Sequence, residues 1–443
     1  MKKIAIAVGI LALIILLVIS AKPGKNIATA ENSKHYKQNS IIEKPKKNIK
    51  VNGKIVFQDS LLTVIKVWGT HYDRGLAYGY LLGERIKIVY EGYIGKAMKE
   101  NLAKAKKAVA SNKYLTIDEK YIEECKAIVA GMDSAGVDLS GFSYEDLIVA
   151  NSFLDLQSII KGYNLSNGCS SLMAWGKVTA GSELKGKSMV TRNLDWTAAS
   201  KLLRNNLIVI HIPAEKDEQP WLSVGYVGHV GALSGTNKSG LSVFQHVMYD
   251  DIKVKDFLTY EPVWFSMRKA LEQNDFDKSG QNDVNDLKSV LIQNKNGYAA
   301  GYILSALAPS TAGADSLIAM VAELAPDKPL FTFRNSSFDD KFNQNMLYAA
   351  NYPISRNNEK RYCKRYDGTI NAVNKIQNLD PETAWQIMAK NSCLPDVNLQ
   401  MIQVIPEMSV LKISLWKSNK GAFNYAPQLF NLKDLFAPEK IKK

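Results

Sequence analysis

A change in the predicted secondary structure at Gly168, from mostly helix to mostly strand, constrains the fold of this chain more than any other feature of its sequence. Before it, a β-rich stretch at residues 55–68 is followed by helical patterns. After it, Cys169–Trp175 (CSSLMAW) begins a series of short strand-like stretches, separated by turns and by helices. Groups of strands with helices between them predict a layered α+β body.

Hydrophobic periodicity and turn residues locate the individual elements of this body. We expect strands at Ser188–Asn193, Leu207–Ile212, Trp221–Tyr226, Leu241–Met248, Ser316–Glu323, Leu330–Arg334, Met346–Ala350, Met401–Ile405 and Val410–Trp416. We expect helices at Tyr260–Gln273, Asp283–Gln293 and Pro381–Lys390. Before Gly168, the sequence indicates one strand and then mostly helix.

Two features before Gly168 predict how its helices pack and begin. Gly75, Gly79 and Gly83 lie four residues apart, a spacing that lets a helix approach a neighbour closely. Thr116–Glu119 and Ser143–Asp146 have the pattern of capping boxes. We therefore expect one helix to begin after Thr116 and another after Ser143.

The N-terminus carries the pattern of an export signal. Lys2 and Lys3 precede an apolar run of 16 residues, Ile4–Ile19, which small residues follow. This order is typical of a signal peptide, so we expect cleavage after Ala21, with residues 1–21 as a retained anchor as the alternative. We expect residues 22–54, rich in Lys and Asn, to form a solvated tether and the protein to be exported (periplasmic, extracellular or lumenal).

Positive charge is concentrated in the same N-terminal part. The formal net charge is +13, but residues 1–54 contain eleven Lys and two Glu, so residues 55–443 carry only +4. No later stretch interleaves basic side chains with aromatic ones. A body of this size with so little excess charge does not bind nucleic acid through its charge. We expect no nucleic-acid partner, and membrane contact only through the N-terminal segment.

The cysteines and histidines exclude some chemistry. The four cysteines, Cys125, Cys169, Cys363 and Cys393, are too few for a disulfide framework. The five histidines show no metal-ligand spacing, so we expect no metal and no cofactor. One disulfide, between Cys363 and Cys393, is compatible with their separation, and free thiols are the alternative.

Cys169 is the candidate nucleophile. It follows a glycine at the start of a predicted strand, and Arg192 lies near the end of the next one, with Asp195 just after it. If the two strands pair as a hairpin, both side chains return to the end of the sheet where Cys169 lies. An arginine beside a thiol lowers its pKa and favours the thiolate, and a carboxylate can hold a protonated amine. From the residues alone, an inert buried cysteine beside a plain ion pair is the alternative.

The order Cys169-Ser-Ser, then Arg192-Asn-Leu-Asp195, resembles the nucleophile region of the linear-amide C–N hydrolases of the N-terminal-nucleophile (Ntn) superfamily. These comprise the choloylglycine hydrolases, the penicillin acyltransferase-like C45 peptidases and the acid ceramidase-type amidases. Further segments resemble the C45 branch in the same order, over most of residues 65–416. They are Gly69–Gly83 (a glycine-rich helix), Ile122–Gly136 (a pro-segment helix, with Ala130 departing from its pattern), His229–Leu241 (a G-x-x-G-x-N-x-x-G-L turn) and Met346–Tyr352 (a strand end).

This resemblance implies a four-layer αββα fold and a proenzyme. The Gly168–Cys169 bond would be cut autocatalytically, separating a mostly helical pro-segment, residues 55–168, from a catalytic chain, residues 169–443, and the fragments would stay associated. The freed α-amino group, with a pKa of about 8, would be the base for its own thiol. By the same resemblance, Arg192 would polarise the thiolate, Asp195 would orient the amine and Asn351 would donate to the oxyanion.

Two departures from the family pattern concern the substrate side. The strand that supplies a second oxyanion Asn in related amidases reads Val243–Val247 here and contains none. Gln245, His246 or a backbone N–H would have to take that place. Tyr352 follows Asn351 where the family pattern has His.

The resemblance implies a hydrolase that cleaves linear amides of small molecules, in particular N-acyl amides, through an acyl-enzyme, with acyltransferase side activity. An acyl pocket would be lined by residues such as Phe244, Met248, Trp264 and Phe265. Two alternatives remain open. One is a papain-like protease that pairs Cys169 with His211, His229 or His246, and the other is an exported binding protein that keeps the fold without being cleaved.

Overall fold

The computed structural model describes residues 48–111, 113–161, 168–255, 257–310, 317–337, 341, 345–356 and 363–439. The expected signal segment, residues 1–21, and most of the expected tether lie outside this range. The parts of the chain before and after Gly168 belong to one compact unit that starts at Lys44. Among the described residues, no helix has the length and hydropathy needed to cross a bilayer.

Nine strands form the larger sheet. In spatial order they are β1 (Gly53–Gln58), β2 (Leu62–Gly69), β5 (Asn206–Pro213), β6 (Trp221–Tyr226), β7 (Ser234–Asn237), β8 (Ser242–Val247), β9 (Tyr302–Leu307), β10 (Ala319–Leu324) and β11 (Phe331–Arg334). All neighbours are antiparallel except β2 and β5, which run parallel. Because β2 precedes Gly168 and β5 follows it, both parts of the chain build this sheet.

Six antiparallel strands form the smaller sheet. In spatial order they are β12 (Met346–Ala349), β3 (Cys169–Ala174), β4 (Met189–Asp195), β13 (Asn398–Ile405), β14 (Val410–Leu415) and β15 (Gln428–Asn431). The predicted hairpin of β3 and β4 is present, with Cys169 opposite Leu194. The ends of the hairpin that carry Cys169 and Asp195 therefore coincide.

The α-helices follow the sequence order α2 (His71–Val89), α3 (Gly95–Met98), α4 (Leu102–Ala110), α5 (Glu119–Ser134), α6 (Tyr144–Asn151), α7 (Phe153–Lys161), α8 (Ser200–Leu203), α9 (Val263–Glu272), α10 (Val284–Ile292), α11 (Lys364–Val373), α12 (Pro381–Asn391) and α13 (Leu432–Leu435). A π-helical turn, Tyr90–Ile94, continues α2 towards α3.

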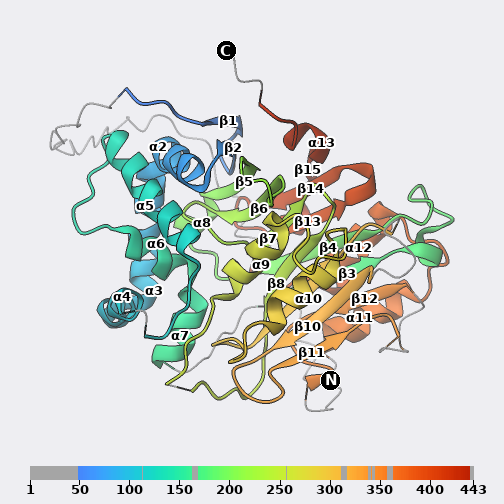
Figure 1. Cartoon of the computed structure of the whole chain (residues 1–443). Coiled ribbons are helices and arrows are strands. Elements are labelled where there is room, and N and C mark those ends of the chain that lie inside the picture. Colours follow the sequence, from blue (N-terminus) through green and yellow to red (C-terminus); the bar gives the residue numbers. More distant parts are fainter. Residues whose placement is uncertain are drawn as a thin grey trace, which may run out of the picture. The chain divides into compact units, whose positions relative to one another are not determined.

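Three clusters of buried hydrophobic side chains define four layers. One lies between the sheets and joins residues such as Ile208 of the larger sheet to Met173 of the smaller. A second joins the other face of the larger sheet to α2, α5, α6, α7, α9 and α10, and a third joins the smaller sheet to α11 and α12. Figure 1 shows α2, α5 and α6 on one side of the two sheets and α11 and α12 on the other. This αββα order confirms the expected fold class.

Strand β5 shows how the sequence specifies this layering. Leu207 and Val209 belong to the cluster under the helices, whereas Ile208 and Ile210 belong to the cluster between the sheets. Successive side chains of a strand point to opposite faces. A strand covered on both faces is therefore hydrophobic throughout.

The glycines of α2 allow it to lie unusually close to α5. A Cβ atom added at Gly79 would come 1.9 Å from the carbonyl oxygen of Ile128, and one added at Gly131 would come 2.1 Å from that of Leu76. Both distances are far below van der Waals contact. The prediction that these glycines permit close helix packing is confirmed.

The structure also corrects the sequence predictions. Residues 55–68 are not one strand but the hairpin of β1 and β2, and β1 starts inside the expected tether. The helix expected after Thr116 begins at Glu119 with Asp118 as its N-cap, and no capping box forms there. The capping box at Ser143 is confirmed. After Gly168, six strands and α-helices were not expected: β7, β9, β15, α8, α11 and α13.

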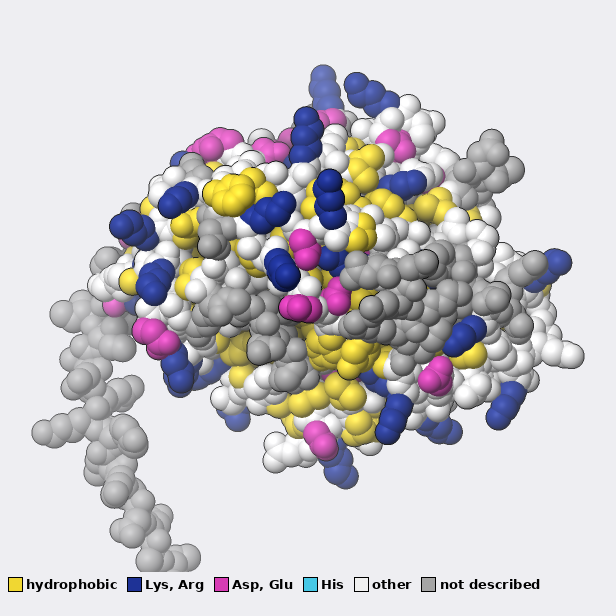
Figure 2. All heavy atoms as spheres, turned by 90° about the horizontal axis from the view of Figure 1, so that it is seen from below, with side chains coloured by type: hydrophobic (Ala, Val, Ile, Leu, Met, Phe, Trp, Pro, Cys, Tyr) yellow, Lys and Arg dark blue, Asp and Glu magenta, His cyan; other side chains and the backbone are white. Residues whose placement is uncertain are grey.

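The surface carries charge of both signs. On the face shown in Figure 2, Lys and Arg side chains are dispersed among Asp and Glu instead of gathering into one basic patch, and hydrophobic side chains collect in one area. This distribution agrees with the small excess charge of residues 55–443.

Candidate active site

The Gly168–Cys169 bond lies buried at the start of β3, held by hydrogen bonds on both sides. The carbonyl oxygen of Gly168 accepts from the backbone N–H of Asp195 (2.8 Å), and the N–H of Cys169 donates to Oδ1 of Asn351 (2.9 Å). A Cβ atom added at Gly168 would lie 2.9 Å from that Oδ1 and from the Arg365 guanidinium. The residue before Cys169 therefore fits without a shift only if it is glycine.

Arg192 is fully buried beside the thiol. Its Nη2 lies 3.7 Å from Sγ of Cys169 and donates to the carbonyl oxygen of Gln245 (3.0 Å). Burial raises the pKa of the Cys169 thiol above its ordinary value and outweighs the lowering by the Arg192 charge. Arg192 thus shifts the pKa of the thiol in the expected direction, but burial raises it by more, and the role of Arg192 in forming the thiolate stays a prediction.

Asp195 ends β4 with its carboxylate buried. Oδ1 accepts from Nδ2 of Asn398 (2.8 Å), and Oδ2 accepts from the N–H of Leu394 (3.1 Å). Burial raises the pKa of Asp195 to about 7, against the lowering by these hydrogen bonds and by Arg365. The carboxyl group therefore changes its charge near neutral pH.

Asn351 follows β12 and links the two sheets. Its Nδ2 donates to the carbonyl oxygen of Val247 at the end of β8 (2.7 Å), while Oδ1 faces the N–H of Cys169. The amide thus holds the backbone of Cys169 in place. Its role as an oxyanion donor stays a prediction.

Arg365, at the start of α11, completes the site. Its guanidinium donates to Oδ1 of Asn351 (2.5 Å) and to the carbonyl oxygen of Cys169 (3.2 Å), and it lies 3.5 Å from Oδ2 of Asp195. The side chain is only 13% exposed. The apolar spacing of Tyr366, Ile370 and Val373 was the one signal for a packed helix here.

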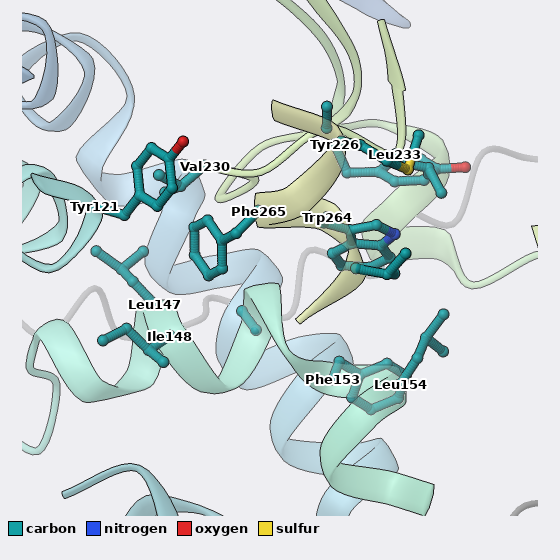
Figure 3. Close-up of a cluster of buried hydrophobic side chains, with 14 of the residues drawn as sticks. Tyr121, Leu147, Ile148, Phe153, Leu154, Tyr226, Val230, Leu233, Trp264 and Phe265 are labelled. Carbon is teal, nitrogen blue, oxygen red and sulfur yellow. The ribbon is translucent and has the colours of Figure 1, made fainter. Parts of the chain in front are cut away.

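An apolar cavity lies beside Cys169. The helices before Gly168 contribute residues such as Tyr93, Phe153 and Leu154 to its wall, and the later chain contributes Trp196, Leu233 and Trp264. Figure 3 shows Trp264 between Tyr226 and Leu233 on one side and Phe153 and Leu154 on the other. Both parts of the chain are therefore needed to form the cavity.

Gln245 carries a side-chain amide, the same group as the second oxyanion Asn that strand Val243–Val247 lacks. It lines the cavity with Cys169, its Oε1 accepts from Nε1 of Trp264 (3.3 Å), and its buried Nε2 has no hydrogen-bond partner among the described residues. The neighbouring His246 instead lies between Ser171 and Ser305. Of the two substitutes considered from sequence, only Gln245 lines the cavity.

The acyl pocket expected from sequence is only partly the one observed. Trp264 lines the cavity, but Phe244 and Met248 belong to the cluster between the sheets, and Phe265 stacks on Tyr121. The correction follows from strand alternation. Gln245 and Val247 face the cavity, so their neighbours face the opposite side of the sheet.

No histidine is paired with the thiol in the part of the chain that the structure describes. His211 is buried and stacks on Trp221 at 4.2 Å between ring centroids. His229 lines the cavity, and burial lowers its pKa to about 4, so the ring is neutral. Cys169 also begins a strand, not a helix, which disfavours the papain-like arrangement.

All four cysteines are free thiols. Of the two alternatives for Cys363 and Cys393, the structure therefore has the free thiols and not the disulfide. Sγ of Cys393 lies 2.9 Å from the carbonyl oxygen of Ala389 in α12, and Cys363 is the N-cap residue of α11. Cys125 is fully buried on α5, as its helical spacing predicts.

Comparison with known proteins gives distant likenesses only. No protein-family model matches the chain, and no curated protein matches it. A Caenorhabditis elegans ortholog of N-acylethanolamine-hydrolyzing acid amidase is 14% identical, with a TM-score of 0.41, over 59% of this chain and 100% of its own. A mutant conjugated bile acid hydrolase from Clostridium perfringens is 10% identical (TM-score 0.41, 61% and 95% of the chains). A penicillin V acylase from Agrobacterium tumefaciens is 10% identical (TM-score 0.35, 56% and 83%). Since these TM-scores are below 0.5, no conclusion about this chain rests on them.

Proposed function

We propose that the protein is an exported, self-processing cysteine Ntn-hydrolase that cleaves linear N-acyl amides through an acyl-enzyme on Cys169. The observation that carries the proposal is the buried Gly168–Cys169 bond at the wall of an apolar cavity. Asp195 and Asn351 hold this bond through hydrogen bonds, and Arg192 lies beside the thiol. Export is supported by Lys2, Lys3 and the apolar run Ile4–Ile19.

Self-cleavage would begin with attack of the Cys169 sulfur on the carbonyl carbon of Gly168. The sulfur–carbon bond forms, the peptide C–N bond breaks, and the thiol proton ends on the departing nitrogen. Water then hydrolyses the thioester, which leaves a carboxylate on Gly168 and restores the thiol. The N–H of Asp195 already donates to the carbonyl oxygen of Gly168, so it is placed to stabilise the negative charge that develops there.

The freed α-amino group would then serve as the base. With a pKa of about 8, it can accept the proton of its own thiol, and the thiolate attacks the carbonyl carbon of the substrate amide. The amine product leaves with that proton, and water hydrolyses the acyl-thioester. Asn351 contacts the nitrogen that becomes this amino group, Arg365 lies between the carbonyl oxygen of Cys169 and Asp195, and Arg192 lies beside the thiol. Gln245, which lines the cavity with an Nε2 that no described residue pairs with, would donate to the substrate oxyanion.

The cavity favours an apolar acyl group. Its wall is almost entirely hydrocarbon, and the few polar groups on it, such as Gln245 and the neutral His229, carry no charge. We therefore assign the acyl side of the substrate to this cavity, with a hydrocarbon group as its content.

The two fragments would stay associated through a buried network of charged side chains, to which both fragments contribute. The network consists of His71, Arg74, Lys120 and Glu124 from the pro-segment and Glu215, Glu218, Arg268 and Glu272 from the catalytic chain. Its four carboxylates face three permanent cations, so a protonated His71 balances the charge. Strands β2 and β5 and the shared cavity wall add apolar contact across the same boundary.

Trapping the acyl-enzyme tests this function. The purified protein is mixed with an N-dodecanoyl amide of a chromogenic amine, quenched in acid and digested for mass spectrometry. We expect release of the amine and a dodecanoyl adduct on the peptide that begins with Cys169, with no adduct or turnover in Cys169→Ala. An N-acetyl amide of the same amine should react at least tenfold more slowly. Full turnover by Cys169→Ala would exclude the mechanism, and an inert, uncut wild type would favour the binding-protein alternative.

A further inference from the structure

Residues 275–286 (DFDKSGQNDVND), which join α9 to α10, carry oxygen-bearing side chains at a specific spacing. Asp275, Asp277, Ser279, Asp283 and Asp286 occupy positions 1, 3, 5, 9 and 12 of this stretch, and a glycine, residue 280, occupies position 6. This is the ligand spacing of a 12-residue EF-hand calcium loop, with Asp in place of the usual Glu at position 12. In an EF-hand, position 7 contributes its backbone carbonyl oxygen.

The structure brings these positions together as the spacing requires. Helix α9 ends at Glu272 and α10 begins at Val284, so a helix flanks the loop on each side (Figure 1). Gly280 has φ +95°, a conformation that suits glycine at the sharp turn. One carboxylate oxygen from each of Asp275, Asp277 and Asp286 lies within 4.8 Å of the others. Ligands that share one Ca²⁺ at 2.3–2.6 Å lie at such separations.

The carboxylates of this loop have no compensating cation, although one of them is completely buried. Asp286 is 0% exposed and Asp283 is 2% exposed. Within the described residues, neither of them, nor Asp275 or Asp277, forms an ion pair with a basic side chain. Their partners are backbone N–H groups and the amide of Gln281. A buried carboxylate that faces two others without a cation is unfavourable.

The other cluster of possible metal ligands in the described residues differs because basic side chains pair with its carboxylates. His71, Glu218 and Glu272 also lie close together, but Arg and Lys side chains pair with both carboxylates there. That charge is already neutralised. In the 275–286 loop, Asp283 and Asp286 also cap α10 through backbone N–H groups, but a carboxylate has about four lone-pair sites, so capping leaves oxygen lone pairs for a metal.

We propose that residues 275–286 form an EF-hand-like site that binds Ca²⁺. The ligands are carboxylate oxygens of Asp275, Asp277 and Asp286, the hydroxyl of Ser279 and the carbonyl oxygen of Gln281, with Asp283 acting through water. Asp286 is one methylene shorter than the usual Glu and supplies one oxygen instead of two, so we expect a dissociation constant on the order of 10⁻⁴–10⁻³ M, the range of extracellular modules. This site revises the expectation of no metal, which considered only Cys and His.

Calcium at this position would stabilise the C-terminal end of α9. Asn282, at position 8, donates to the carbonyl oxygens of Ala270 and Gln273 and accepts from Nδ2 of Asn237 in β7. Helix α9 also carries Trp264 of the apolar cavity. The cation would therefore stabilise the fold next to the proposed substrate site, without touching the chemistry at Cys169.

Calorimetric titration of the full chain with CaCl2, after removal of divalent ions with EDTA, tests the site. We expect a single saturable Ca²⁺ site, weaker binding of MgCl2, and a Tm that rises by about 2 °C in 10 mM CaCl2. Asp275→Asn/Asp277→Asn should weaken Ca²⁺ binding at least tenfold. Asp396→Asn/Asp434→Asn, which removes two exposed carboxylates elsewhere, should bind like wild type.

Three results would overturn the proposal: no Ca²⁺ binding by wild type up to 10 mM, unchanged binding by the double variant, or tighter binding of Mg²⁺ than of Ca²⁺. Circular dichroism establishes that each variant is folded. If the double variant is not, Asp277→Asn alone is used, because its side chain accepts only one hydrogen bond, from the N–H of Ser279. Ca²⁺ binding and self-cleavage are measured separately, so failure of one does not decide the other.

Discussion

Arg268 is the side chain whose removal should most weaken the association of the two proposed fragments. It lies on α9, in the catalytic chain, and is 0% exposed. Its guanidinium donates to Glu124 of the pro-segment (2.6 and 3.1 Å) and to Glu272 (2.9 Å). Arg268→Met keeps an apolar stem of similar length and removes the guanidinium, with its charge, its hydrogen bonds and its contacts with the rings of Tyr121 and Trp221.

The size of the effect follows from what stays paired. Breaking a buried ion pair by removing one partner costs about 3–5 kcal/mol. Glu124 keeps His71 (2.7 Å), and Glu272 keeps Lys120 (2.6 Å), so we expect the lower end, about 3 kcal/mol. That corresponds to roughly a hundredfold weaker association of the fragments.

The strength of association of the fragments is measured by size-exclusion chromatography of the cleaved protein over a series of guanidinium concentrations. Arg268→Met fragments should separate at a clearly lower concentration than wild type. Lys126→Met is the matched control, because Lys126 pairs with Glu123 at 44% and 51% side-chain exposure and such pairs contribute only about 0.2–1 kcal/mol. In an uncut Cys169→Ala background, Arg268→Met should not release a fragment. Separation of Arg268→Met and Lys126→Met at the same concentration would refute a role of the network in association.

Four further outcomes are expected. Burial lowers the pKa of His71, but its hydrogen bonds with Glu124 and Glu218 raise it more, to a net value above 6.5. The protonated ring therefore contributes its full stability below about pH 6.5, and this contribution is lost as pH rises through the higher folded-state pKa. The Tm of wild type should fall over that pH range, and the Tm of His71→Gln should not. Gly168→Val should slow self-cleavage at least tenfold on a gel time course, because its side chain meets Asn351 and Arg365, and cleavage at the wild-type rate would contradict this packing. Arg192→Met should move the pH profile of thiol alkylation by iodoacetamide to higher pH, and an unchanged profile would remove Arg192 from the site. Leu154→Trp should fill part of the cavity and lower turnover of the N-dodecanoyl amide by roughly tenfold while sparing the N-acetyl amide; equal effects on both would place the acyl group elsewhere.

Local sequence patterns were sufficient for the part of the site that one hairpin builds. The alternation of Cys169–Trp175 and Ser188–Asn193, with a glycine-containing connection between them, predicts an antiparallel pair, and such a pair brings Arg192 and Asp195 back to Cys169. The alternation of strand groups and helices predicted a layered α+β body, whereas the four-layer αββα order was implied by the family resemblance.

Contacts that depend on packing between distant segments could not be predicted in the same way. Arg365 reaches Cys169 because α11 packs on the smaller sheet, a contact across 196 residues. Gln245, and not Phe244, lines the cavity because the pairing of β8 with β7 and β9 decides which face of the strand points there, and a shift of one residue would reverse it. The pKa of the thiol depends on burial, which the adjacent Arg192 does not reveal.

The sequence of the new N-terminus is the most direct measurement of the central claim, that Cys169 is freed as an N-terminal nucleophile. Purified wild type, separated on a denaturing gel, should give one fragment that begins with Cys-Ser-Ser-Leu-Met and a second whose mass places its C-terminus at Gly168. Cys169→Ala should give neither fragment. A wild type that hydrolyses N-acyl amides as a single uncut chain, or a cut at any other bond, would contradict the claim.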